Sequence, residues 1–168
     1  MQTLLIMRGL PGSGKSTFAR HLVAQSTPEL TWKRINKDEL RIMLDNNRWS
    51  AENEHNLNQM VAVMVKFYLR GGFSVISDNM NFDPKHIKAA VKLVNLVNED
   101  DKPIKVDIQV VDFATPIDVC IERDRLRSNP VTEQTIRDIH TQWIKDGNFP
   151  DIRNILAKVG QNDDRKET

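Results

Sequence analysis

A glycine-rich stretch near the N-terminus, residues 9–17, has the residue types and spacing that phosphate binding requires. It reads Gly-Leu-Pro-Gly-Ser-Gly-Lys-Ser-Thr and matches the pattern G-x-x-x-x-G-K-[ST]. Backbone N–H groups have to wrap the polyanion, so side chains must be small or absent at Gly12 and Gly14. Lys15 would reach the terminal phosphates, and the Ser16 hydroxyl would coordinate Mg²⁺. The stretch therefore predicts a nucleoside triphosphate site formed by Gly12, Ser13, Gly14, Lys15, Ser16 and Thr17.

The segments on either side supply the context that such a loop needs. Residues 4–7 form a continuous apolar run, as expected of a strand buried on both faces. Residues 18–25 carry apolar side chains at helical spacing, and the N-terminus of that helix would add partial positive charge at the phosphates. A chance glycine-rich turn is the alternative, and the match at every fixed position in this context argues against it.

The rest of the chain alternates short apolar runs with amphipathic helical patterns. Further strands are predicted at 32–35, 73–77 and 104–113, with helices between them. This order predicts an α/β fold with a parallel sheet of four to five strands and helices on both faces. Ligands in such folds bind at the carboxyl ends of the strands, so the residues after each strand are the next candidates. Helix caps are expected at Ser50, Asp83, Thr115 and Thr132.

Asp38 and Arg41 follow the second predicted strand, about one helical turn apart. An aspartate there could accept the proton of an attacking hydroxyl, and a guanidinium on the same helical face could hold a phosphate of the acceptor. Alternatively, Asp38 or Asn36 only caps the helix, and Arg41 pairs with Asp38 or Asp45. The spacing alone leaves both interpretations open.

Asp78 ends the third apolar strand, where an acidic residue can hold Mg²⁺ directly or through water. Asn81 follows it closely. The alternative is a simple turn, since Asp and Asn are common turn residues. The apolar strand and its position favour the functional interpretation.

Arginines follow the fourth strand. Arg123 and Arg127 are four residues apart and would share a helical face. Such a segment could close over a triphosphate and neutralise the charge that builds up during transfer. The alternative is a solvated basic face that pairs with Glu122 and Asp124.

Composition bounds the class of protein. The 168 residues have a net charge of +1 and a charged fraction of 28%, so any anion site must be local. We expect one domain over residues 1–160 and a polar tail over 161–168. The single cysteine, Cys120, lies in an apolar helical pattern that predicts a buried structural thiol. The four histidines lack ligand spacing, and no apolar run is long enough for a membrane span, so a cytoplasmic location is expected.

Together these segments resemble the kinase module of the bacteriophage and bacterial 5′-polynucleotide kinases, within the P-loop kinases of adenylate-kinase type. The resemblance extends over most of the chain to about residue 145 and rests on residues 9–17, 35–41, 76–84 and 122–127. Many nucleotide-hydrolysing proteins share the first segment. The Asn-x-Asp-x-x-Arg spacing of the second narrows the family.

On the donor side, the resemblance implies a P-loop kinase fold that binds ATP and Mg²⁺ through Lys15 and Ser16. The last segment would be a lid. Arg127 would act with Lys15 on the transferring phosphate, and Arg123 would lie near the nucleotide base or phosphates. The family's setting implies the cytoplasm of a bacterium or of a phage-infected host, and a homo-oligomer is compatible with the sequence.

On the acceptor side, Asp38 would be the general base that activates the 5′-hydroxyl of a DNA or RNA end. Arg41 would bind the phosphate on the 3′ side of the acceptor nucleotide. The third segment departs from the family, which commonly has an acid followed by a threonine and an asparagine. Asp78 can serve the metal, and Asp78 and Asn81 the substrate, but the two residues between them supply no hydroxyl.

Three functions remain open. The first is an ATP-dependent 5′-hydroxyl polynucleotide kinase, and a basic stretch from Lys33 to Arg48 beside the acceptor side supports it. The second is a small-molecule kinase acting on a nucleoside, sugar or antibiotic, which needs a closed acceptor pocket. The third is a non-catalytic nucleotide-binding module, which would tolerate loss of Asp38. Many relatives carry a phosphatase domain with a D-x-D motif that this sequence lacks, so no 3′-phosphatase activity is expected.

Overall fold

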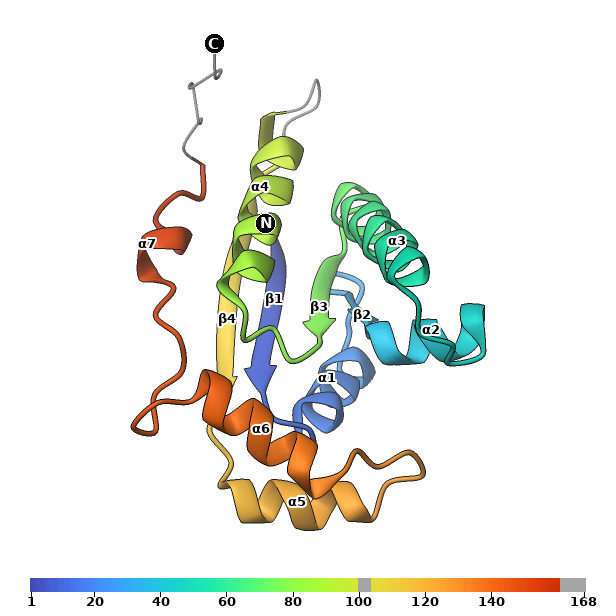
Figure 1. Ribbon diagram of the computed structural model, residues 1–168. Coiled ribbons are helices and arrows are strands. Elements are labelled where there is room, and N and C mark those ends of the chain that lie inside the picture. Colours follow the sequence, from blue (N-terminus) through green and yellow to red (C-terminus); the bar gives the residue numbers. More distant parts are fainter. Residues whose placement is uncertain (100–103, 161–168) are drawn as a thin grey trace.

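Four parallel strands form one sheet in the part of the chain that the computed structural model describes, residues 1–99 and 104–160 (Figure 1). The strands are β1 (Gln2–Gly9), β2 (Trp32–Ile35), β3 (Ser74–Asp78) and β4 (Val106–Phe113). Their order in the sheet is β2-β3-β1-β4, so β1 is paired on both sides. The predicted α/β fold with a parallel sheet is therefore confirmed.

Helices cover both faces of this sheet. They are α1 (Lys15–Ala24), α2 (Lys37–Asp45), α3 (Ala51–Arg70), α4 (Pro84–Glu99), α5 (Ile117–Arg125), α6 (Glu133–Trp143) and α7 (Arg153–Leu156). Alternate residues of β1 explain the two layers. Leu4 and Ile6 join a core with α3, α4 and α7, whereas Leu5 and Met7 join a core with α1. Burial on both faces accounts for the continuous apolar run in this strand.

The carboxyl ends of β1 and β4 point toward α5 and α6 (Figure 1). A separate apolar cluster holds these two helices against the loop that follows β1. Its buried members are Leu10, Phe82, Cys120, Ile121 and Ile136. The Cys120 thiol is buried, as predicted, and burial raises its pKa, so it packs as an apolar group. The cluster places α5 beside the glycine-rich loop.

Side chains cap three of the helices as predicted. Ser50 accepts a hydrogen bond from the backbone N–H of Asn53, and Thr132 accepts one from Thr135. Asp83 does the same for Lys85. The prediction for Thr115 is wrong, because its hydroxyl donates to the carbonyl of Ser13, 3.0 Å away. This hydrogen bond ties the segment before α5 to the glycine-rich loop.

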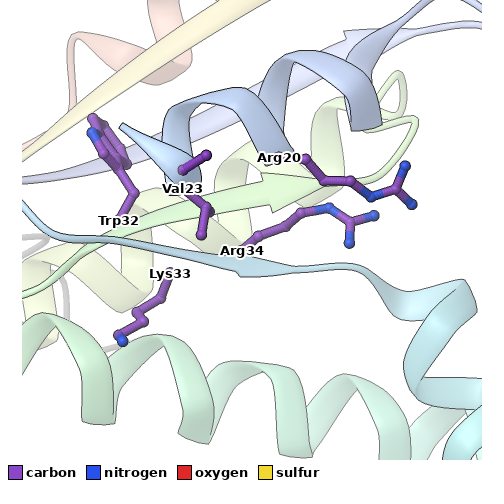
Figure 2. A pocket seen from close by; sticks show the side chains of 6 residues that line it. Arg20, Val23, Trp32, Lys33 and Arg34 are labelled. Atoms are coloured by element: carbon purple, nitrogen blue, oxygen red, sulfur yellow. The ribbon is translucent and has the colours of Figure 1, made fainter. Parts of the chain in front are cut away.

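The edge strand β2 sends alternate side chains to opposite faces of the sheet (Figure 2). Lys33 points toward α3, and its ammonium lies 4.7 Å from the centre of the Phe73 ring. Trp32 and Arg34 face α1 and line a shallow cavity of about 390 Å³ between β2 and α1. Arg34 lies on the α1 side of the sheet, and from there its guanidinium contacts Asp78 at the end of β3.

The predicted polar tail at 161–168 lies outside the described residues. The division into a domain at 1–160 and a tail therefore stays a prediction. Among the helices of residues 1–99 and 104–160, none has the length and apolar character needed to span a membrane.

Candidate functional site

The loop between β1 and α1, residues 9–17 and here called the phosphate loop, depends on glycines in left-handed conformations. Gly12 has φ of 76° and Gly14 has φ of 98°. A Cβ atom at Gly12 would lie 2.2 Å from the carbonyl oxygen of Cys120, so only glycine fits there. Gly14 is the N-cap of α1 and receives no side-chain cap from the described residues. The first N–H groups of α1 are therefore available to an anion.

Lys15 lies folded inside this loop. Its ammonium donates to the carbonyl oxygens of Gly9 and Leu10, both at 2.8 Å, and to the Ser13 hydroxyl at 3.2 Å. Burial lowers the pKa of Lys15 to about 8, although the nearby charge of Asp78 opposes the shift. The phosphate loop thus holds the cation by its own backbone carbonyls, which phosphate oxygens could replace.

Charges from three other segments act on the Lys15 ammonium. Burial has the largest effect on its pKa, Asp78 and Asp38 raise the pKa, and Arg127 lowers it. These residues come from β3, from α2 and from the turn after α5. Charged residues at or beyond the ends of the other three strands therefore influence the pKa of this one cation.

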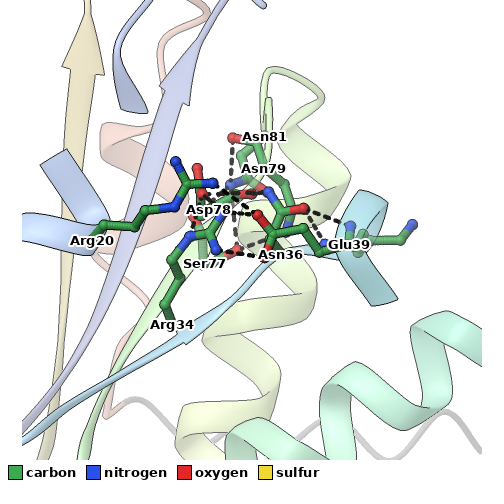
Figure 3. Close-up of polar contacts among 9 residues, drawn as sticks. Arg20, Arg34, Asn36, Glu39, Ser77, Asp78, Asn79 and Asn81 are labelled. Carbon is green, nitrogen blue, oxygen red and sulfur yellow. Dashed lines mark hydrogen bonds and ion pairs between the residues drawn. The ribbon is translucent and has the colours of Figure 1, made fainter. Parts of the chain in front are cut away.

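Asp78 is buried at the end of β3, and its two carboxylate oxygens have different surroundings (Figure 3). Oδ2 accepts hydrogen bonds from Nε of Arg34 at 2.7 Å and from the Asn36 amide at 3.3 Å. Oδ1 is also buried, and it has no hydrogen-bond partner among the described residues. An orphaned buried carboxylate oxygen is suited to a cation.

The donor set near the phosphate loop fits Mg²⁺. A carboxylate oxygen of Asp78 and the Ser16 hydroxyl are hard oxygen ligands, and Mg²⁺ usually takes one or two such protein ligands together with substrate phosphates. The described residues contain no group of three or more His, Cys, Asp or Glu that could hold a metal ion. A metal that relies on phosphate oxygens is thus the kind that this site suits.

Two asparagines brace the strand ends. The side-chain oxygen of Asn36 accepts from the N–H of Glu39 and so caps α2, while its amide donates to the carbonyl of Asp78 at 2.7 Å. Asn36, one of the two candidates for this cap, is therefore the cap of α2, and the ion pair between Arg41 and Asp38 is the other part of the same structural alternative. Asn81 is buried with φ of 48° and donates to the carbonyl of Met7 at 2.9 Å. Its amide links β1 to the end of β3, and its contact with substrate stays a prediction.

Asp38 and Arg41 meet on the exposed side of α2. The Asp38 side chain is 75% exposed, and its Oδ1 accepts from Nη1 of Arg41 at 2.7 Å. The guanidinium is anchored on its other side by Glu54 of α3, whose Oε1 lies 2.5 Å from Nε of Arg41. Lys37 also binds Glu54, at 3.1 Å, and the hydrogen bond from Arg41 lowers the pKa of Glu54. Glu54 thus orients the predicted acceptor-binding arginine, a role that the sequence did not indicate.

The predicted basic stretch beside the acceptor side is largely paired. Arg34 binds Asp78 and Glu39, and Lys37 and Arg41 bind Glu54. These pairs neutralise most of the expected positive surface.

The lid arginines differ in position from the prediction. The helix α5 ends at Arg125, so Arg127 lies in the turn that follows and does not share a helical face with Arg123. Nη1 of Arg123 lies 4.0 Å from the position of a Cβ atom at Gly14, which places this guanidinium against the phosphate loop. Arg125 points elsewhere, as predicted, and pairs with Glu133.

Asp124 fixes the turn that carries Arg127. It is only 1% exposed, its Oδ1 lies 2.9 Å from Nη1 of Arg127, and its Oδ2 accepts from the N–H of Val131 at 2.8 Å. The sequence suggested a solvated ion pair for this residue. The structure shows that this carboxylate is buried and anchors both Arg127 and the turn that carries it.

Replacing Asp124 by Asn should lower the free energy of unfolding by about 1–3 kcal/mol, because the buried charge is lost and the amide offers one acceptor oxygen to two donors. Urea unfolding measures this change. Asp118, whose side chain is 85% exposed on the same helix, provides the control variant Asp118→Asn. Equal stability of the two variants would show that Asp124 anchors nothing.

Comparison with known proteins places these observations in context. Residues 4–143 match the protein family described as AAA domain. A chain of a solved structure described as the Pnkp1/Rnl/Hen1 RNA repair complex is similar, with a TM-score of 0.69, 27% identity, and coverage of 84% of this chain and 43% of that chain. A second structure of the Pnkp1/Rnl/Hen1 complex gives a TM-score of 0.61 and 27% identity, with 78% and 41% coverage. This chain thus spans less than half the length of either solved chain, and no curated protein matched it.

Proposed function

This chain belongs to the AAA domain family, and from that premise we propose that it transfers the γ-phosphate of ATP to the 5′-hydroxyl of a DNA or RNA end. The proposal rests mainly on one observation, that α2 begins beside the end of β3, where Asn36 donates to the carbonyl of Asp78, and presents the exposed carboxylate of Asp38 with its partner Arg41 at this end of the sheet. A module that only binds nucleotide has no use for an exposed base beside the phosphates. The 27% identity to a chain of an RNA repair complex supports a nucleic-acid acceptor.

The residues divide the transfer between a donor side and an acceptor side. Lys15 and the backbone N–H groups of the phosphate loop hold the ATP phosphates, and Arg127 neutralises charge on the γ-phosphate. Asp38 accepts the proton of the 5′-hydroxyl, and the hydroxyl oxygen forms a bond to the γ-phosphorus. The bond between the γ-phosphorus and the β–γ bridging oxygen breaks, and ADP leaves. Mg²⁺ bound through Ser16 and Asp78 would add positive charge at the phosphates.

An open acceptor side favours a polynucleotide end over a small molecule. The Asp38 side chain is 75% exposed. Two shallow cavities, one between β2 and α1 and one between α5 and α6, are lined by residues other than Asp38 and Arg41. A kinase for a nucleoside, sugar or antibiotic would need to enclose its acceptor, whereas a strand end can enter an open site.

The direct test is incubation of the protein with labelled ATP and a 5′-hydroxyl oligonucleotide, as DNA and as RNA, with and without Mg²⁺. Label should appear on the oligonucleotide only with Mg²⁺ present. An oligonucleotide that already has a 5′-phosphate is the matched control and should stay unlabelled. Absence of label on every 5′-hydroxyl acceptor would reject the proposal.

Replacing Arg41 by Ala should raise the KM for the oligonucleotide about 10- to 100-fold, because a charge-assisted hydrogen bond to a phosphate is lost. Steady-state kinetics with two acceptors, one with and one without a phosphate on the 3′ side of the first nucleotide, measure the effect. Lys88→Ala is the control, at an exposed position of α4 outside the basic stretch from Lys33 to Arg48. An equal increase in KM for both acceptors would exclude the phosphate contact.

A further inference from the structure

The guanidinium of Arg34 lies between two carboxylates at the edge of the site (Figure 3). Its Nε and Nη2 both contact Oδ2 of Asp78, at 2.7 and 2.6 Å. Nη1 and Nη2 contact the two oxygens of Glu39, at 2.7 and 2.8 Å. Only 12% of the Arg34 side chain is exposed. A single side chain from the edge strand β2 therefore directs two N–H groups at Oδ2 of Asp78.

The consequence falls on the other oxygen of that carboxylate. Two N–H groups directed at Oδ2 fix the plane of the Asp78 carboxylate, and Oδ1 is left buried without a partner among the described residues. A buried carboxylate is held in one orientation by the charged and hydrogen-bonding partners that its oxygens contact. Besides Arg34, the side chain contacting this carboxylate is the Asn36 amide, at 3.3 Å. Arg34 thus makes most of the contacts that hold the Asp78 carboxylate in this orientation.

We propose that Arg34 is a positioning residue that holds Asp78 so that its Oδ1 faces the Mg²⁺ of bound Mg·ATP. The inference rests on the proposed function. It adds a residue that lies outside the phosphate loop, outside α2 and outside the arginine segment 122–127. Strand pairing alone does not require this contact, because β2 and β3 are already joined by backbone pairing over four residues, from Trp32 to Ile35. The ion pair with Asp78 therefore serves the orientation of the carboxylate.

Loss of Arg34 should expose this role through the effect of Mg²⁺ on nucleotide binding. In Arg34→Met the Asp78 carboxylate has only the Asn36 amide, and the Lys15 ammonium becomes a competing partner for it. We expect the gain in affinity that Mg²⁺ gives to a fluorescent ATP analogue to fall about 10-fold, the size of a lost charge-assisted hydrogen bond. Affinity without Mg²⁺ should change less than about twofold by the same argument.

Two further variants make the experiment specific. Arg20→Met removes the other arginine that contacts Glu39, at 3.1 Å, and leaves Asp78 untouched, so the Mg²⁺ gain should match that of the wild-type protein. Arg34→Lys keeps the charge but cannot direct two N–H groups at Oδ2, so its gain should be intermediate. This variant also decides the question if Arg34→Met does not fold.

The outcomes separate this inference from the proposed function. If the wild-type protein shows no Mg²⁺-dependent binding of the ATP analogue, the proposed function fails. If the wild-type protein shows it and both Arg34 variants keep the full gain, the positioning role of Arg34 is excluded while the proposed function stands. A loss of gain in Arg20→Met equal to that in Arg34→Met would also exclude the role, because it would trace the effect to Glu39.

Discussion

Replacing Asp38 by Asn is expected to lower kcat for transfer to a 5′-hydroxyl oligonucleotide about 10²- to 10⁴-fold, the usual contribution of a general base. The amide has the size of the carboxylate but cannot accept the proton. Binding of ATP should stay within about twofold of the wild-type value, because Asp38 is not among the groups proposed to hold the ATP phosphates. Steady-state kinetics and a nucleotide-binding titration measure the two quantities separately.

Because Asp38 is exposed, Asp38→Asn should change catalysis without changing the fold. Its side chain is 75% exposed, and the cap of α2 is Asn36, so the helix should form without the carboxylate. Arg41 loses one partner in Asp38→Asn, yet Glu54 still holds the guanidinium. Asp45→Asn, at the other end of the same helix, is the matched control and should keep full activity. Loss of ATP binding together with kcat would make Asp38 a structural residue instead.

The parts of the molecule that the sequence predicted are those set by local patterns. The apolar run before Gly9 and the glycine-rich loop with Lys15 follow from short-range geometry, and the parallel sheet follows from the alternation of strands and helices. The order of the strands in the sheet was not predicted. The family match over residues 4–143 and the solved chain at 27% identity confirm the P-loop fold and the resemblance to a polynucleotide kinase module.

The parts that the sequence did not predict are partners distant along the chain. Glu54 of α3 contacts Arg41 of α2, and Arg34 of β2 contacts Asp78 at the end of the neighbouring strand β3. Sequence spacing cannot choose these partners among 23 acidic residues, because the choice depends on how the helices pack. Asp124 is a different case. Its burial depends on the turn after α5, where the chain leaves the helix two residues before Arg127.

Replacing Gly12 by Ala is expected to weaken ATP binding by at least about 100-fold and to lower the free energy of unfolding by about 3 kcal/mol. The residue has φ of 76°, which costs any other residue about 1–2 kcal/mol. In addition, the new Cβ would lie 2.2 Å from the carbonyl oxygen of Cys120, a backbone atom in a buried part of α5. The phosphate loop or α5 must then move, and the N–H groups that face the phosphates lose their alignment. Isothermal titration with ATP and urea unfolding measure the two effects.

Gly147 offers a control that separates backbone strain from steric conflict. Its φ of 75° is nearly that of Gly12, but a Cβ atom there would meet nothing within 4 Å among the described residues. Gly147→Ala should therefore lower the free energy of unfolding by only about 1–2 kcal/mol, the cost of the backbone conformation, and leave ATP binding unchanged. If the two variants lose equal stability, the contact between the phosphate loop and Cys120 has no energetic importance. If only Gly12→Ala loses ATP binding, close packing against α5 is what gives the phosphate loop its binding shape.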